Sequence, residues 1–286
     1  MPWLKDIGYK EKPVKFNEGN HSYYLNGKRM KGVTSVIGVK DKDWKGLWMT
    51  KMMKEYILEN IDLEKKYNVT ELTALLNDGR NAYNIRSDRA KDDGKEGHRL
   101  VEESIVSGKR YKLEDLIYDD KYFQYKVRNI YGNWLEWEKQ HKIEYVAIEV
   151  VVCDDDPSVW VAGTIDCIAY VDGILALIDW KSSKQFSEDL CLQTAMYGNM
   201  LKLGGVTEPF VRRGVRLDKG ISRETEEPIK DYVPLYDKSN DIIIPTDYNK
   251  DLSGFMALVG VSRWLSYIDK DHKKKAPYGN YKVLTF

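Results

Sequence analysis

Residues 160–181 read Trp-Val-Ala-Gly-Thr-Ile-Asp-Cys-Ile-Ala-Tyr-Val-Asp-Gly-Ile-Leu-Ala-Leu-Ile-Asp-Trp-Lys, and this stretch decides the fold. Branched and aromatic residues fill both halves, which predicts two strands. Asp172-Gly173 between the halves suits a two-residue type I′ turn, so the strands are expected to pair as an antiparallel hairpin. Counting back from that turn places Asp166 opposite Asp179.

Two facing carboxylates are the unusual feature of this hairpin. Because alternate residues of a strand share a face, eight side chains are expected on one face: Thr164, Asp166, Ile168, Tyr170, Leu175, Leu177, Asp179 and Lys181. Carboxylates opposite each other, about 5 Å apart at Cβ, destabilise a hairpin unless a cation lies between them or one is protonated. The hairpin therefore predicts a cation site with a lysine beside it. This interpretation fails if the two aspartates do not come within reach of one cation.

Composition narrows the class of protein. Of 286 residues, 42% are hydrophobic and 31% are charged, as in an ordinary soluble globular protein. The 45 basic and 45 acidic residues cancel, which argues against a purely electrostatic nucleic-acid binder. Three cysteines, without a CxxC pair, are too few for a four-thiolate iron–sulfur cluster. No apolar run approaches the roughly 20 residues of a membrane span, and the N-terminus lacks a secretory signal, so we expect a soluble, intracellular protein.

The remaining sequence predicts helices and strands around the hairpin. Helices are expected over 44–60, 70–76 (Thr70 as N-cap), 88–107, 119–140, from an N-cap at Ser187 to Gly204, and over 248–268. Strands are expected over 14–31 (a hairpin at Asn26-Gly27), 143–152, 209–217 (with Gly214 as a bulge or break), 229–236 and 241–244. This order predicts an α/β fold. We divide it into an N-terminal β-hairpin and helical lobe, 1–88, packed over the open face of the sheet, and a core with a C-terminal β/helix extension, 89–286.

The helix predicted over 88–107 carries polar residues on its apolar face. His98 and Glu102 share one stripe with Val101 and Ile105. Glycines 94 and 97 lower helix propensity, which indicates a close backbone approach just before His98. Taken alone, a histidine in such a position is more often a hydrogen-bonded packing residue.

Three further patterns have both a chemical and a structural explanation. Trp44 and Trp48 lie among lysines and could stack bases, or they pack on the core above a solvated lysine face. Glu149 interrupts an apolar strand, either near a metal or at an exposed edge. Gln193 and Tyr197, four apart on a helix, share one face.

In combination these motifs resemble the PD-(D/E)XK nuclease superfamily. The resemblance rests on Gly163-x-x-Asp166, then Asp179-Trp-Lys181, then Gln193-x-x-x-Tyr197, in this order and on these elements. The upstream Gly94-x-x-x-His98-x-x-x-Glu102 is similar to the RecB-type branch, whose members carry a histidine before the catalytic hairpin. The likeness covers residues 89–217, with Ile165 standing where the superfamily name has proline.

Shorter phrases resemble the mitochondrial genome maintenance exonucleases and their phage-type relatives. They are Ala162-Gly-Thr-Ile-Asp, Ile178-Asp-Trp-Lys-Ser-Ser, His21-x-Tyr and Val33-Thr-Ser-Val. The resemblance implies a restriction-endonuclease-like α/β core, with an antiparallel hairpin in a central mixed sheet and flanking helices, and a metal-dependent phosphodiesterase.

The resemblance also implies roles for individual residues. One or two Mg²⁺ or Mn²⁺ ions would be bound by His98, Asp166, Asp179 and the backbone carbonyl of Trp180. Lys181 would position or deprotonate the attacking water, or stabilise the transition state, and Gln193 would orient Lys181 or that water. Tyr197 would contact a phosphate or stack near the cut nucleotide. Supporting roles fall to Glu102 and Glu149 near the metal, and to Ser182, Ser183, Lys184, Trp44 and Trp48 along the substrate.

The expected activity is DNA hydrolysis by a single-strand exonuclease or flap-processing enzyme in replication, repair or recombination. The expected partner is DNA that is single-stranded or has free ends. A structure- or site-specific endonuclease and an inactive DNA-binding protein are the alternatives. The chain has no Gly-x-x-x-x-Gly-Lys-Ser/Thr phosphate loop, so no nucleotide cofactor is expected.

Overall fold

The computed structural model describes residues 4–40, 43–222 and 227–274. The helices are α1 (Val33–Ile37), α2 (Asp43–Asn60), α3 (Val69–Ser107), α4 (Lys121–Gln140), α5 (Asp189–Leu203) and α6 (Tyr248–Lys274). The strands are β1 (Val14–Asn17), β2 (Ser22–Leu25), β3 (Lys28–Gly32), β4 (Ile143–Asp154), β5 (Val161–Val171), β6 (Ile174–Lys181), β7 (Val211–Arg216) and β8 (Asp241–Ile243). Short 3₁₀ turns cover Leu4–Ile7, Leu113–Asp115 and Lys238–Asn240. The chain is an α/β protein, as predicted.

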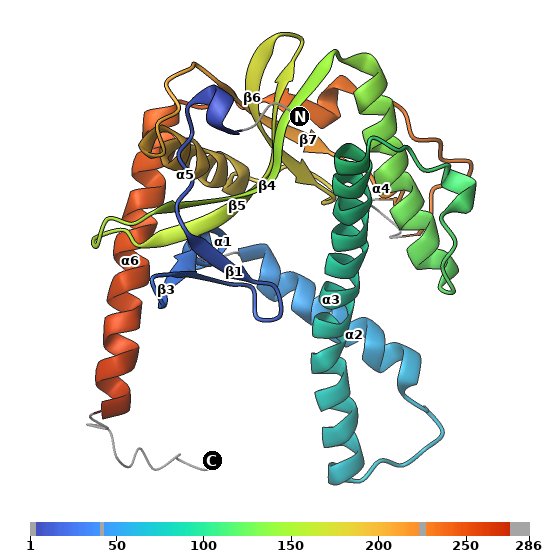
Figure 1. The fold of residues 1–286 in the computed structure, drawn as a ribbon. Coiled ribbons are helices and arrows are strands. Elements are labelled where there is room, and N and C mark those ends of the chain that lie inside the picture. Colours follow the sequence, from blue (N-terminus) through green and yellow to red (C-terminus); the bar gives the residue numbers. More distant parts are fainter. Residues whose placement is uncertain (1–3, 41–42, 223–226, 275–286) are drawn as a thin grey trace.

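A mixed eight-stranded sheet forms the centre of the molecule (Figure 1). Its order is β1-β2-β3-β5-β6-β7-β8, and β4 pairs with β5. β3 runs parallel to β5 and β6 runs parallel to β7, while the other neighbours are antiparallel. The predicted N-terminal hairpin, with its turn at Asn26 and Gly27, is confirmed, and β1–β3 extend the same sheet as the central hairpin.

Helices cover both faces of the sheet. One core lies under α1, α5 and α6 and includes Val36, Met196, Phe255, Leu175 and Leu177. The opposite core lies under α3 and α4 and includes Val101, Trp134, Ala176, Ile178 and Trp180. The alternation along β6 therefore assigns successive residues to different cores, as the pleat of a strand requires.

The central hairpin is formed as predicted near its turn. Asp172 (φ 54°) and Gly173 (φ 84°) both have the left-handed backbone that a type I′ turn needs. The ladder runs from Val171–Ile174 to Cys167–Ile178 and ends there. The predicted facing of Asp166 with Asp179 is therefore wrong as ladder pairing, and Thr164 and Lys181, expected on the same face, are not ladder partners either. β6 leaves β5 at this point, and β3 pairs with residues 161–162 instead.

The long helix α3 corrects the prediction of separate helices over 70–76 and 88–107. Its 39 residues run without a break, so the boundary drawn at residue 88 falls inside it. Contacts with α2 hold the first half of this helix. Gly79 packs so closely on α2 that a Cβ there would lie 3.2 Å from Ile57 Cγ1, and Arg86 bonds Glu55 at 3.1 Å. Tertiary packing thus overrides the weak local propensity of this stretch.

The start of α3 yields a first prediction. The N-cap is Asn68 rather than Thr70: its side chain accepts from Glu71 N at 2.9 Å, and the Glu71 carboxylate accepts from Asn68 N at 3.0 Å. Asn68→Ala is expected to destabilise the first turns of α3 by about 1 kcal/mol. Amide hydrogen exchange over residues 69–76 measures the loss. Asn68→Ser, which keeps a cap acceptor, should retain wild-type protection, and equal exchange in all three proteins would contradict the cap.

Three smaller predictions also need correction. The helix predicted to be capped by Ser187 has Glu188 at its N-cap, with no side-chain cap bond. Within the described chain, residues 229–236 form no strand. Gly214 pairs regularly between Asp179 and Ile242 rather than forming a bulge, and a Cβ there would lie 2.6 Å from Leu190 Cδ2.

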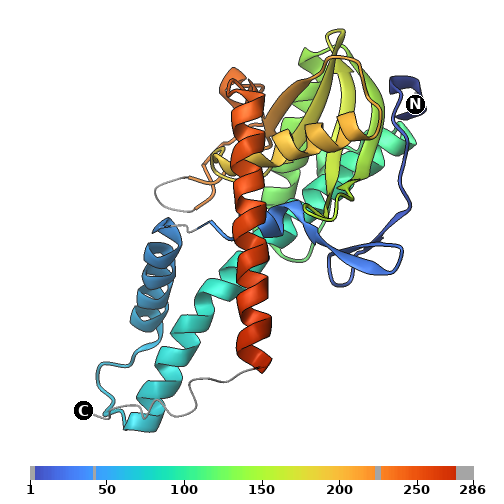
Figure 2. The same cartoon turned by 90° about the vertical axis from the view of Figure 1, so that its left-hand side faces the viewer.

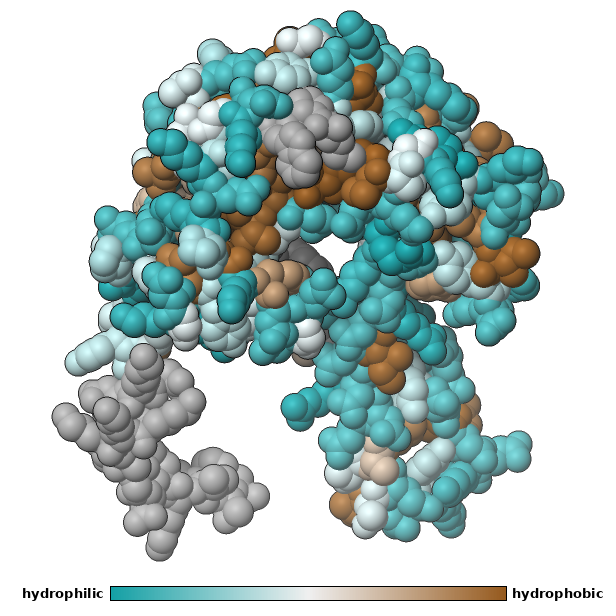
Figure 3. All heavy atoms as spheres, viewed as in Figure 1, coloured by the Kyte–Doolittle hydropathy of each residue, from teal (hydrophilic) through white to brown (hydrophobic). Residues whose placement is uncertain are grey.

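The molecule has an arched outline. Figure 1 shows α6 and the first half of α3 extending from the sheet in the same direction, and Figure 2 shows α6 crossing the side that α5 covers. We call residues 43–90, which comprise α2 and the first half of α3, the arm. The space-filling view shows a hollow between the arm and the rest of the protein (Figure 3). Among the described residues, no helix is both long and apolar enough to cross a membrane.

Candidate active site

The candidate site lies where β6 diverges from β5. From Asp166 toward the start of β5, the strand no longer pairs with β6. The Asp166 carboxylate instead accepts a hydrogen bond from Trp180 N at 2.8 Å. On the other edge of β5, Glu149 lies opposite Asp166, between the pairs Ile148–Cys167 and Val150–Ile165. Three neighbouring strands, β4, β5 and β6, therefore bring carboxylates to one region of the sheet, where β6 separates from β5.

A chain of contacts links the hairpin to α5. The Lys181 ammonium lies 2.5 Å from Asp179 Oδ2 and donates to Gln193 Oε1 at 3.1 Å. Gln193 Nε2 in turn donates to the Tyr197 hydroxyl at 3.2 Å. Because Gln193 and Tyr197 are one turn apart on α5, the helix presents both to the end of β6. The structure thus brings these four predicted site residues into one chain of contacts.

Gly163 makes room for the tyrosine. A Cβ at Gly163 would lie 2.5 Å from Tyr197 Cε1 and 3.0 Å from its hydroxyl oxygen, so only glycine fits here without a shift. Beside it the Thr164 hydroxyl lies 2.9 Å from that of Tyr23 on β2. The N-terminal strands thus contribute a side chain next to the site.

His98 reaches the site from α3, on the opposite side of the sheet from α5. The predicted close approach at the two preceding glycines is confirmed: a Cβ at Gly94 would lie 2.6 Å from Ser182 Oγ, and one at Gly97 would overlap Ile130. His98 Nε2 is buried and has no hydrogen-bond partner among the described residues. Burial lowers its pKa to about 4, Lys181 acts in the same direction and Asp179 opposes it. The imidazole is therefore neutral at pH 7, with a free nitrogen for a ligand.

The charges of Asp179 and Lys181 depend on each other. Burial raises the pKa of Asp179 to about 6, with Asp166 adding to the rise and Lys181 opposing it. Burial alone would lower the pKa of Lys181, but Asp179 and Asp166 outweigh that effect, so its pKa is raised. Lys181 is thus an ammonium ion at neutral pH. Of the roles open to it from sequence, this favours stabilising negative charge over deprotonating water.

Glu149 and Glu102 extend the acidic group. Glu149 has a left-handed backbone (φ 51°). Its side chain is solvent-accessible at the surface of the sheet, yet the protein around it raises its pKa to about 8, chiefly by desolvation and then through Asp166 and Glu102. Desolvation also raises the pKa of half-buried Glu102. Both residues therefore lie close to the predicted site, as expected of supporting carboxylates.

The raised pKa of Glu149 gives a second prediction. In an unfolded chain a glutamate has a pKa of about 4.3. Between that value and about 8 the folded protein binds the extra proton, so stability falls as pH rises through this window and levels off above it. Glu149→Gln is expected to gain stability relative to wild type across the same window. Urea unfolding at pH 5 to 9 in EDTA measures the difference, and a difference constant with pH would contradict the assignment.

The predicted metal ligands only partly fit a cation. Asp179 Oδ1 and His98 Nε2 are buried without hydrogen-bond partners among the described residues, as two donors awaiting an ion would be. Asp166 lies close enough to both Asp179 and Lys181 to shift their pKa values. The described residues contain no group of three or more His, Cys, Asp or Glu side chains arranged to hold a metal ion. The cation that Asp179 contacts is the Lys181 ammonium. Oxygen donors with one imidazole suit Mg²⁺ or Mn²⁺.

The predicted substrate contacts are less clearly placed. Ser182 lies against α3, whereas Ser183 and Lys184 are exposed and the Ser183 hydroxyl bonds Gln185 O at 2.8 Å. Trp48 is half-buried on α2, and the side chain of Trp44 lies outside the described residues. The Trp180 side chain packs on Trp137 at 5.1 Å between ring centroids, on the core side. The ligand role of its carbonyl stays a prediction.

Sequence reasoning missed Tyr23 and a group of buried charges, Asp93, Lys126 and Lys219. Burial raises the pKa of Tyr23, and Glu149 and Asp166 add to the rise, which places its hydroxyl beside the carboxylates. His21-x-Tyr was noted only as a resemblance. The buried charges come from three elements, so no spacing in the sequence connects them.

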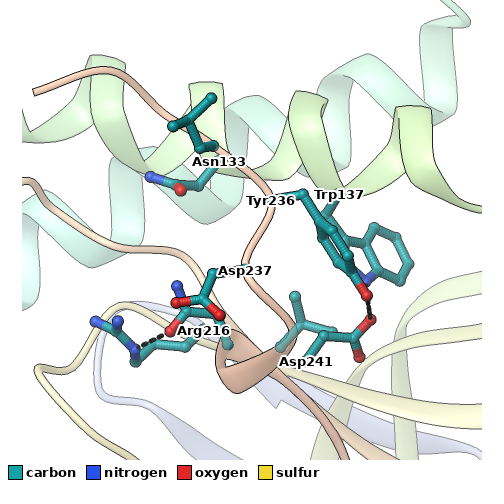
Figure 4. A pocket seen from close by; sticks show the side chains of 9 residues that line it. Asn133, Trp137, Arg216, Tyr236, Asp237 and Asp241 are labelled. Atoms are coloured by element: carbon teal, nitrogen blue, oxygen red, sulfur yellow. Dashed lines mark hydrogen bonds between the residues drawn. The ribbon is translucent and has the colours of Figure 1, made fainter.

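A separate hollow lies between α4 and the loop before β8 (Figure 4). Asp241 at its base accepts from Arg213 Nε at 2.6 Å, from Arg213 Nη2 at 2.7 Å and from Trp137 Nε1 at 2.9 Å, and it contacts His141. Arg216 bonds Asn240 and Asp218. These polar groups satisfy one another, and no predicted site residue lines the hollow, so we assign it to holding the loop rather than to chemistry.

Comparisons with known proteins give no functional assignment for this chain. No protein-family model matches the chain, and no curated protein matches it. The functional argument therefore rests on the geometry where β6 separates from β5.

Proposed function

We propose that this protein is a metal-dependent DNA nuclease with a PD-(D/E)XK core, hydrolysing phosphodiester bonds as a single-strand exonuclease. One observation carries the proposal: an ammonium, a buried carboxylate and an amide–phenol pair form a continuous chain, Asp179–Lys181–Gln193–Tyr197, beside Asp166. A structural ion pair has no need of a neighbouring imidazole with an unbonded nitrogen, but that nitrogen is present at His98.

The residues divide the chemistry between them. His98, Asp166 and Asp179 would hold Mg²⁺ or Mn²⁺, which when bound supplies charge stabilisation on the phosphate and a more acidic water. Lys181, kept protonated by the carboxylates, stabilises negative charge that develops on the phosphate oxygens. Gln193 fixes the lysine through its amide oxygen. Tyr197 remains a neutral phenol, because burial raises its pKa well above the ordinary value, and it acts as a hydrogen-bond donor.

The outline of the molecule leaves room for a nucleic-acid substrate. The hollow between the arm and the rest of the protein leaves one side of the molecule open (Figure 3). An endonuclease specific for a structure or a site is the second candidate. An inactive DNA-binding protein fits less well, because binding alone needs no carboxylates with raised pKa values.

One assay tests the activity and separates the candidates. The full chain with millimolar Mg²⁺ or Mn²⁺ is incubated with a labelled linear single strand and with a covalently closed circular single strand. An exonuclease shortens the linear DNA and leaves the circle intact, whereas an endonuclease opens the circle. If both substrates survive with either metal, the nuclease proposal is wrong.

A further inference from the structure

The two sides of α6 have different surroundings. Phe255, Val259 and Ser262 on one side are buried. Lys31 on β3 donates to Ser262 O at 2.9 Å and to Ser266 Oγ at 2.8 Å, so this side packs on the rest of the protein. Figure 2 shows α6 lying outermost where it crosses α5, and the opposite side of the helix therefore points away from the sheet.

Large apolar side chains are exposed on that opposite side. Trp264 is 59% exposed and Tyr267 is 67% exposed, and Val261 and Leu265 are exposed as well. With half-buried Ile268, three of these residues recur at i, i+3, i+4 and i+7, which is the spacing of one helix face. A contiguous apolar patch that includes Trp and Tyr is typical of a protein–protein contact. We call these five residues the outer α6 patch.

The first half of α6 carries small side chains on the same line. Ser253 and Ala257 are exposed, and they precede Trp264 by nearly whole numbers of helical turns. Val261 stands at the middle of α6 (Tyr248–Lys274), so small side chains lie before the middle of the line and large ones after it. The line is therefore complementary in size to a copy of itself that runs in the reverse direction.

An antiparallel second copy of the chain matches this arrangement. A two-fold axis near Val261 sets Ala257 of one copy against Trp264 of the other. The same axis sets Ser253 against Ile268. A parallel pair would instead crowd the two Trp264 side chains against each other and leave the small residues facing one another across a gap.

The charges along α6 favour the same direction. Antiparallel pairing brings Lys250 opposite position 271, which is an aspartate, and it does so at both ends of the helix pair. Parallel pairing would oppose lysine to lysine. The 45 basic and 45 acidic residues of the chain also balance, so two copies meet without long-range repulsion.

We propose that the outer α6 patch is an interface for a second copy of this chain, with the two α6 helices antiparallel across a two-fold axis near Val261. The inference does not depend on the proposed activity. Because each copy contributes one helix, the interface is small, and the dimer is expected to dissociate at roughly micromolar concentrations.

Sedimentation equilibrium of the full chain, without DNA or metal, tests the dimer. The mean mass should rise from that of a monomer towards twice that value as the concentration increases through the micromolar range. Trp264→Ser should raise the dissociation constant at least about tenfold, because it removes the largest side chain of the patch. Leu58→Ser is the matched control: it removes an apolar side chain that is 65% exposed on α2, and it should leave the dissociation constant unchanged. A monomer at all concentrations, or equal dissociation constants for Trp264→Ser and wild type, overturns the proposal.

Cross-linking tests the direction of the two helices. Val261→Cys lies near the axis, so a short bismaleimide should join two copies of this variant. Lys250→Cys should not be joined, because antiparallel pairing sets its two copies about 30 Å apart at 1.5 Å per residue. Wild type gives the background from Cys153, Cys167 and Cys191. Joining of Lys250→Cys, or no joining of Val261→Cys, contradicts the antiparallel pair. A patch that binds another protein, DNA or a different part of the same chain would leave the pure protein monomeric, and that result also overturns the proposal.

Discussion

Asp179→Asn is expected to lower the rate of DNA hydrolysis by about 10³-fold or more, because a loss of roughly 4 kcal/mol of transition-state stabilisation follows when a cation site loses its charge. The carboxylate is 1% exposed and is the group that Lys181 contacts at 2.5 Å. The asparagine has nearly the same shape, so the change removes charge without opening a cavity. Single-turnover cleavage of a labelled single strand measures the rate.

The matched control lies on the same hairpin. Asp172→Asn makes the same chemical change in the turn, where asparagine also accepts a left-handed backbone. It should keep activity within about twofold, because Asp172 contacts His141 rather than the candidate site. Circular dichroism checks that both variants are folded. Wild-type activity in Asp179→Asn would remove the central residue from the proposal.

Local sequence signals predicted the centre of the fold well. The Asp172-Gly173 turn fixes the register of its hairpin, since both residues must adopt positive φ, and the observed pairs follow from it. The contact between Gln193 and Tyr197 follows from their spacing on one helix. Such features depend on residues only a few positions apart, so they can be predicted from the sequence.

Features set by distant elements were not predictable in this way. The divergence of β6 from β5 depends on β3 taking its place beside residues 161–162, and no hairpin pattern contains that information. The unbroken α3 depends on its packing against α2, despite an Asn-Asp-Gly run that is typical of a loop. The contacts of Asp93 with Lys126 and Lys219 join α3, α4 and the segment after β7. Each case required the tertiary structure.

Gly163→Ala is expected to destabilise the protein by about 1 to 3 kcal/mol, the usual cost of overpacking a core. Its new methyl group would lie 2.5 Å from Tyr197 Cε1 and 3.1 Å from Val33 Cγ2, with α5 and α1 both packed behind them. Because Tyr197 bonds Gln193, which bonds Lys181, displacement of the ring should also reduce DNA hydrolysis. Urea unfolding measures the stability, and single-turnover cleavage measures the rate.

A double-mutant cycle identifies the ring of Tyr197 as the cause. Tyr197→Leu removes the atoms that the new methyl group would strike, so Gly163→Ala should cost at least about 1 kcal/mol less in that background than in wild type. Gly260→Ala is the control for the substitution itself: a Cβ there meets nothing within 4 Å, and on α6 the change should stabilise by up to about 1 kcal/mol. Additive effects of Gly163→Ala and Tyr197→Leu would show that the glycine is needed for some reason other than space for the ring, and the link from hairpin to α5 would then rest on the Lys181–Gln193 bond alone.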